Sequence, residues 1–185
     1  MSKVFLVAVG EELNHAEQVN GIPVLVCGVG KLNAAMGVFE CIQKGFTEII
    51  NIGSCGSLNH HYGEILKIGT VFQDIDARPI CDYGLSPFEA IEPFIEIDKD
   101  SKSSCFSTDY FYDAKQNPKY SPSYLKSIQT STVFDMECYA QAKVCRNLGV
   151  PYQSYKWVSD NGDGSDWQEN CRAGFEVVKD LLEKK

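Results

Sequence analysis

Two acidic side chains, Asp135 and Glu137, lie where the sequence changes from the pattern of a strand to that of a helix. Residues 130–134 are rich in β-branched types, whereas apolar residues recur every four positions from Met136 onward. Open α/β sheets bind ligands at this kind of edge, so the two carboxylates are candidate ligand-binding groups. The structural alternative is that Asp135 caps the helix and Glu137 is a first-turn acid favoured by the helix dipole.

A second candidate is the segment 28–31 (GVGK), which follows an apolar run and precedes a helix expected over 32–44. Glycines at a helix start let the backbone approach an anion, although a plain tight turn gives the same pattern. In the case of a plain turn, Lys31 is a solvated side chain.

Ser54 lies among small residues in the segment 53–57, where main-chain amides and a hydroxyl can face a ligand. A serine hydrolase would need a base histidine beside this serine. The only histidines are His15, His60 and His61, so this pattern disfavours that chemistry.

Asp160 follows the last expected strand, in the acidic and glycine-rich stretch 159–164 (SDNGDG). The stretch is similar to a calcium loop, but the spacing of ligands and of the terminal glutamate is not matched. Asp160 is thus another acid at the carboxyl end of a strand, and an ordinary loop is the alternative.

The composition limits the possible partners. A chain of 185 residues is long enough for one domain with a real core, so we expect a single domain over 1–185. The net charge of −8 and the lack of a basic stripe argue against nucleic acid. Small molecules or proteins are the expected partners.

The cysteines and the N-terminal segment indicate the compartment. Eight cysteines are spread singly, without the pairs that a zinc site needs, and are expected to be small buried residues in a reducing environment. The apolar run over 4–9 is too short for a signal peptide, and no stretch approaches membrane-spanning length. We therefore expect a cytoplasmic protein without a membrane partner.

The remaining chain predicts the elements that position these residues. Strands are expected over 4–9, 22–27, 48–52, 69–74, 130–134 and 151–158, and helices over 32–44, 135–148 and from Ser165 or Asp166 onward. The apolar stripe of the last helix (Trp167, Cys171, Phe175, Val178 and Leu182) is expected to be core. Residues 77–104, apart from a short strand within 92–98, and 117–123 are expected to be loops. This order predicts an α/β protein with three α/β/α layers around a central mixed β-sheet.

Four motifs occur in an order that resembles the nucleoside phosphorylase family, most nearly its 5′-methylthioadenosine/S-adenosylhomocysteine nucleosidases. They are 28–35 (GVGKLNAA), 51–58 (NIGSCGSL), 134–137 (FDME) and 158–160 (VSD). The resemblance implies a nucleoside phosphorylase-like fold, hydrolysis of a purine nucleoside without metal or cofactor, and a homodimer or larger homo-oligomer.

The resemblance also implies roles on the sugar side of the substrate. Glu137 corresponds to the glutamate that binds the ribose hydroxyls, and Met136 to the methionine that packs against the sugar. Ser54 lies in the motif on the side of the nucleophile. Glu11 or Glu12 corresponds to the carboxylate that activates water, and the sequence leaves both open.

On the base side, Asp160 corresponds to the acid that protonates the purine, with Ser159 supporting it. Phe111 corresponds to an aromatic residue that stacks on the base. Cleavage of an N-glycosidic bond creates positive charge on the sugar and negative charge on the purine, so acids at both ends act where charge develops.

Other functions stay open at this stage, and one of them is a nucleosidase that acts on another purine ribosyl compound. A phosphorylase would need an arginine for phosphate, and none of Arg78, Arg146 and Arg172 precedes the 28–35 motif, where the family's phosphorylases usually carry one. Hydrolysis is therefore favoured over phosphorolysis. A non-catalytic nucleoside-binding protein, which retains Glu137 but has no water base, is the alternative from another class.

Overall fold

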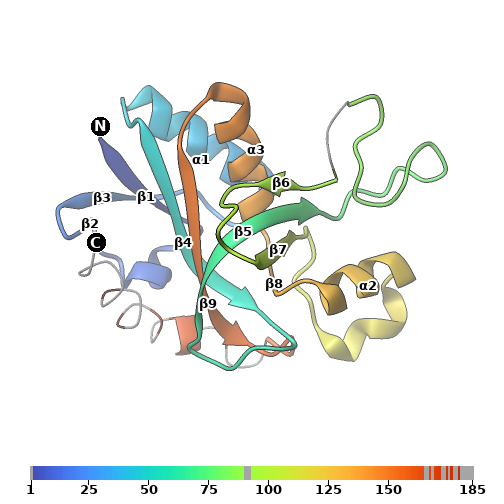
Figure 1. Ribbon diagram of the computed structural model, residues 1–185. Helices are drawn as coiled ribbons and strands as arrows, with labels where there is room; N and C mark the ends of the chain where they lie inside the picture. The colour runs from blue at the N-terminus through green and yellow to red at the C-terminus, as the bar shows by residue number, and fades with distance from the viewer. Residues whose placement is uncertain are drawn as a thin grey trace.

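Figure 1 shows the computed structural model of the chain, which describes residues 2–89 and 93–164. Beyond these ranges it describes Trp167, Glu169, Asn170, Cys171, Gly174, Glu176 and Lys179. The strands are β1 (Lys3–Val7), β2 (Gln18–Val19), β3 (Ile22–Val26), β4 (Glu48–Gly56), β5 (Ile65–Gln73), β6 (Ile95–Glu96), β7 (Ser103–Ser107), β8 (Val133–Asp135) and β9 (Tyr152–Asp160). The α-helices are α1 (Lys31–Gln43), α2 (Pro122–Thr130) and α3 (Cys138–Leu148), and two 3₁₀ helices span Gly10–Leu13 and Ala114–Lys119.

The described strands form one mixed sheet in the order β2-β3-β1-β4-β8-β7-β5-β6, and β9 pairs with both β4 and β5. β4 runs parallel to β1 and β9, while β9 runs antiparallel to β5. β7 runs parallel to β5 and β8, and β8 meets the end of β4 at the pair Gly56 and Phe134. The central strands thus close into a ring that brings strand ends together at one place.

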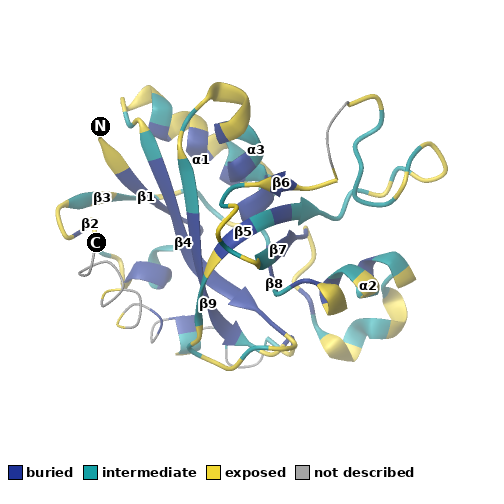
Figure 2. Cartoon of the chain, viewed as in Figure 1, coloured by how far each residue is buried: buried dark blue, intermediate teal, exposed yellow. Residues whose placement is uncertain are grey.

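Side chains pack on both faces of the central strands, which explains their continuous apolar runs. Val4 and Leu6 of β1 belong to a cluster with buried residues of α1 and α3, and these two helices lie side by side (Figure 1). Phe5 and Val7 belong to a second cluster with Trp157. Figure 2 shows the resulting burial along the middle of β4 and β9. The expected three-layer α/β/α fold with a mixed sheet is confirmed.

Several predicted element boundaries were wrong, among them that of β5, which begins at Ile65 instead of Gly69. β4 continues through the small residues to Gly56 instead of ending at Ile52. The expected loop 117–123 contains the second half of a 3₁₀ helix and the start of α2, where Pro122 occupies the first turn and the Ser121 hydroxyl accepts a bond from Tyr124 N at 3.2 Å. Proline at this position starts a helix rather than breaking it.

Asp135 was expected to cap α3, and this boundary was also wrong. It is the last residue of β8, and α3 begins at Cys138, although the Asp135 carboxylate still accepts a bond from Cys138 N at 2.9 Å. The predicted helix end is confirmed, because Gly149 adopts the left-handed conformation after Leu148.

The described residues from Trp167 onward are helical, as expected for the last helix. Its predicted caps, Ser165 and Asp166, and three residues of its apolar stripe, Phe175, Val178 and Leu182, lie outside the described residues. None of the helices in the described part has the length and hydrophobicity needed to span a bilayer. All eight cysteines are free and six are buried, as the composition predicted.

Candidate functional site

A cavity of about 250 Å³ lies where the ends of the central strands meet. Most of the sequence-predicted site residues line it together: Glu12, Ser54, Phe111, Met136, Glu137, Ser159 and Asp160. They come from the 3₁₀ helix after β1, from β4, from the loop after β7, from the β8–α3 junction and from β9. The closed arrangement of strands therefore unites residues that lie far apart in the sequence.

Glu12 is only 3% exposed and its carboxylate is bound on both oxygens. One oxygen accepts a bond from Ala8 N at 2.9 Å, and the other accepts bonds from Ser54 N at 2.7 Å and the Ser54 hydroxyl at 2.9 Å. Burial raises the pKa of Glu12, while Lys156 and these hydrogen bonds oppose the rise. Glu11 does not line the cavity; its side chain is 35% exposed and lies 3.9 Å from His15.

Glu137 lies at the β8–α3 junction and is almost fully buried. Its Oε1 atom accepts a bond of 2.9 Å from the backbone N–H of Gly30, the residue that precedes α1. Burial and the neighbouring Asp135 charge raise the pKa of Glu137 to about 8. The glycine segment therefore binds a carboxyl group, and that group is the protein's own Glu137. Gly30 has φ of +96°, a conformation that strains other residues.

A buried ion pair of Asp135 and Lys156 lies beside these two glutamates. Lys156 Nζ is 2.7 Å from Asp135 Oδ2, and the Ser107 hydroxyl donates to the other Asp135 oxygen at 2.6 Å. Burial acts to raise the pKa of Asp135, but the ammonium outweighs it and holds that pKa below its ordinary value. Burial acts to lower the pKa of Lys156, and Asp135 and neighbouring groups raise it well above the ordinary value.

Sequence reasoning did not identify Lys156 as a member of the site. The available signal was a charged residue in the middle of a strand of aromatic and β-branched type, which an apolar core admits only when the charge is paired.

At the other end of the cavity, the two oxygens of Asp160 accept bonds from the Ser159 hydroxyl at 2.9 Å and from Gly162 N at 2.8 Å. Phe111 is 53% exposed and meets Trp167 edge to face, with ring centroids 6.4 Å apart. The Trp167 indole N–H donates to the Ser54 hydroxyl at 3.0 Å. Trp167 was expected to be core; it packs against the core and also lines the cavity.

The structure also groups Cys105, Asp135 and Cys138, whose ligand atoms lie within 4.8 Å of one another. Two thiols and a carboxylate can hold a metal ion. The Lys156 ammonium is already bound to Asp135, however, and a second positive charge there would be repelled. We therefore assign no metal to these three residues.

Comparison with known proteins agrees with this architecture. Residues 103–184 match the sequence model of the Phosphorylase superfamily, and no curated protein matches the chain. A 5′-methylthioadenosine/S-adenosylhomocysteine nucleosidase from Helicobacter pylori has a TM-score of 0.80 at 20% identity, over 100% of this chain and 99% of its own. The fold is that of the nucleoside phosphorylases.

Other structures with the nucleoside phosphorylase fold give similar values. Futalosine hydrolase of Helicobacter pylori has a TM-score of 0.79 at 20% identity, over 99% of this chain and 97% of its own. The 5′-methylthioadenosine/S-adenosylhomocysteine nucleosidase from S. pneumoniae, solved with a transition-state inhibitor, has a TM-score of 0.79 at 18% identity, over 99% of each chain. The resemblance carried by the four sequence motifs is thereby confirmed at the level of the fold, and residues 103–184 match the model of the Phosphorylase superfamily.

Proposed function

We propose that the protein hydrolyses the N-glycosidic bond of a purine nucleoside. The observation that carries this proposal is the placement of a buried carboxylate, Glu12, and a second carboxylate, Asp160, in the lining of one cavity. Water attacks the anomeric carbon and gives a proton to Glu12, the bond from that carbon to the purine breaks, and Asp160 gives a proton to the purine. The products are a free sugar and a free base, and each carboxyl group acts where charge develops.

Glu12 is the better water base of the two adjacent candidates. Only Glu12 lines the cavity, and its hydrogen bonds to Ala8 N, Ser54 N and the Ser54 hydroxyl favour the ionised form that a base needs. Ser54 thus supports the side from which the nucleophile enters.

The sugar and base positions follow from the other lining residues. Glu137 is assigned to the ribose hydroxyls and Met136 to the face of the sugar. Phe111 is assigned to the base, because it lines the cavity and is 53% exposed, so its ring is accessible to a planar ligand.

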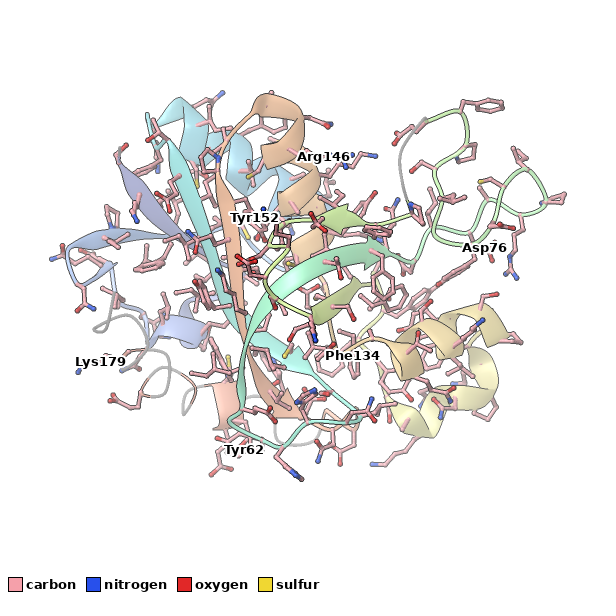
Figure 3. The ribbon with its side chains drawn as sticks, viewed as in Figure 1. Tyr62, Asp76, Phe134, Arg146, Tyr152 and Lys179 are labelled. Carbon is pink, nitrogen blue, oxygen red and sulfur yellow. The ribbon has the colours of Figure 1, made fainter. Side chains whose placement is uncertain are left out.

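The charge of the cavity favours water over phosphate as the nucleophile. Its described lining contains four acids, Glu12, Asp135, Glu137 and Asp160, and neither arginine nor lysine. Arg78 pairs with Asp76 outside the cavity, and Arg172 lies outside the described residues. Figure 3 shows Arg146 on α3 and Asp76 on its loop, both well away from Phe134 in the cavity wall. A phosphate dianion would thus find no cationic side chain in this described lining.

The 5′ group of the substrate is proposed to be methylthio or S-homocysteinyl. A futalosine-like substrate is the second candidate, because another cavity, of about 490 Å³, shares Tyr110 with the first. Tyr83, Tyr120 and Tyr124 also line this second cavity, which therefore has room and aromatic surface for a larger substituent.

The test is to incubate the purified protein with 5′-methylthioadenosine, S-adenosylhomocysteine, futalosine, adenosine and inosine, with and without phosphate, and to follow base and sugar by chromatography. We expect base release without phosphate and a free sugar product. Strict dependence on phosphate with a sugar 1-phosphate product would identify a phosphorylase instead. Binding without any product would support the nucleoside-binding protein.

A further inference from the structure

Lys31 was expected either beside a bound anion or in solvent, but in the structure its side chain pairs with two aspartates of the protein, Asp74 and Asp109. It is the first residue of α1, immediately after Gly30, whose N–H binds Glu137. Its side chain is only 18% exposed, and its ammonium contacts Asp74 at the end of β5 and lies 3.0 Å from Asp109. Burial acts to lower the pKa of Lys31, but the two aspartates outweigh it and raise that pKa, so the side chain stays charged at neutral pH.

The two carboxylate oxygens of Asp74 contact different elements, α1 and the loop after β7. One oxygen contacts Lys31, and the other accepts bonds from the Thr108 hydroxyl at 2.9 Å and from Asp109 N at 3.0 Å. Lys31 and Asp74 together thus connect the start of α1 to the loop that follows β7. That loop supplies Thr108, Tyr110 and Phe111 to the lining of the cavity.

The exposed residues of this loop have little burial of their own to hold them in place. Asp109 has a side chain that is 60% exposed, and Tyr110 and Phe111 are more than half exposed. Exposed aromatic residues gain only part of the stabilisation that full burial gives. The polar contacts to Asp74 are therefore one restraint on this loop, beside the bond of 2.9 Å from Thr108 N to the Asp135 carbonyl and the ring contacts of Tyr110 with Tyr120 and Tyr124.

We propose that Lys31 is a positioning residue, which fixes the distance between the start of α1, where Gly30 N binds the ribose-assigned Glu137, and the base-binding loop 108–111. The proposal rests on the proposed function, because it assigns Glu137 to the sugar and Phe111 to the base. Lys31 does not line the cavity, so its effect is on the fit of the nucleoside and not on the bond that breaks.

The test compares Lys31→Met and Lys31→Arg with Lys44→Met as the matched control. Lys44 lies just after α1, in an exposed pair with Glu40. We expect Lys31→Met to raise KM and the calorimetric Kd for adenine by about tenfold or more, with kcat within about threefold, since small misplacements in a site can cost up to about a hundredfold. Lys31→Arg should recover part of the loss, and Lys44→Met should match the wild type. A KM and a Kd within twofold of the wild type in Lys31→Met would overturn the proposal.

Hydrogen exchange of the amides in residues 109–112 tests the tether independently of catalysis. Exchange should be at least severalfold faster in Lys31→Met than in Lys44→Met, and equal rates would overturn the proposal even if the wild type has no activity. A wild type that neither binds nor cleaves nucleosides would refute the proposed function alone. Should Lys31→Met fail to fold, Lys31→Gln gives the same test, because it also removes the ammonium and leaves the bonds of Asp74 to the loop in place; unchanged exchange there also overturns the proposal.

Discussion

Asp160 is the side chain whose protonation the proposed reaction uses most directly. Replacement by asparagine keeps the shape and the bond from Gly162 N but removes the transferable proton. We expect Asp160→Asn to lower the rate of base release by roughly 10²–10⁴-fold, the usual contribution of a positioned proton donor. Calorimetry should still detect nucleoside binding. The control is Asp163→Asn, an exposed acid of the same loop, which should leave the rate unchanged. Turnover of Asp160→Asn near the wild-type rate would rule out the general-acid role.

Adjacent glutamates at the end of β1 allow a closely matched comparison at the residue scale. Glu12 is bound inside the cavity lining, whereas Glu11 faces His15 outside it. We expect Glu12→Gln to lower kcat by at least about a hundredfold, because the amide cannot take a proton from water. Glu11→Gln should retain kcat within twofold. Measured rates in the reverse order would move the water base to Glu11.

At the scale of elements, the Asp135–Lys156 pair joins the end of β8 to the middle of β9. Asp135→Asn or Lys156→Met leaves the other charge buried without compensation, so each should lower the free energy of unfolding by about 3–5 kcal/mol. The double variant should lose less than the sum of the two, because both charges are then gone. Urea unfolding of the four proteins measures this coupling.

The exposed pair Glu40–Lys44 is the control for this cycle, since both side chains are about half exposed. Such pairs at a spacing of four residues contribute only about 0.3–0.5 kcal/mol. Coupling between Asp135 and Lys156 no larger than that of the control pair would show that the buried pair does not stabilise the junction.

Sequence patterns were informative about elements where one physical signal dominated. The helical spacing of apolar residues and Gly149 correctly predicted where α3 ends. The continuous apolar run correctly predicted β1 as a strand that is covered on both faces. Pro122 was misinterpreted because proline marks both loops and first helical turns, and only packing, here the burial of Tyr124 and Ile128 in α2, decides between them.

The site residues also divide into those that a local sequence pattern indicates and those that depend on distant partners. Glu137 lies two residues after β8 and Asp160 is the last residue of β9, so local patterns placed both at the sheet edge. Lys31 and Lys156 depend on partners far away in the sequence, at Asp74 and Asp135. No local pattern encodes such partners without the fold, and for that reason sequence reasoning placed Lys31 in solvent or at an anion and did not single out Lys156.

At the scale of the whole molecule, one face of α1 is apolar and exposed. Leu32, Met36 and Phe39 recur at spacings of four and three residues, which places them on the same face, and Leu32 is 77% exposed. Exposed apolar patches mark association sites, so we propose that this face forms the homodimer that the resemblance implied. Met36→Lys should shift the mass measured by light scattering toward the monomer, whereas Leu148→Lys, on exposed α3 surface, should not. A wild type that is monomeric at micromolar concentration would contradict the proposal.

The stability of the whole molecule should depend on pH through Glu137. Its pKa is about 8 in the folded protein against an ordinary value of 4.5, so between these values the folded state keeps a proton that the unfolded chain has lost. The stability associated with Glu137 is therefore fully present below pH 4.5 and is lost as the pH rises toward 8. The raised pKa of Glu12 changes the stability in the same direction. The contribution of Asp135 changes with pH only below its ordinary pKa of 3.8, and that of Lys156 changes only above its ordinary pKa of 10.5.

We expect the melting temperature of the wild type to fall from pH 5 to pH 8, and Glu137→Gln to reduce that fall by roughly 5 °C or more. Groups common to both proteins contribute equally, so the difference between the two melting curves reports Glu137, and parallel curves would show that its carboxyl group is ionised in the folded state throughout this range.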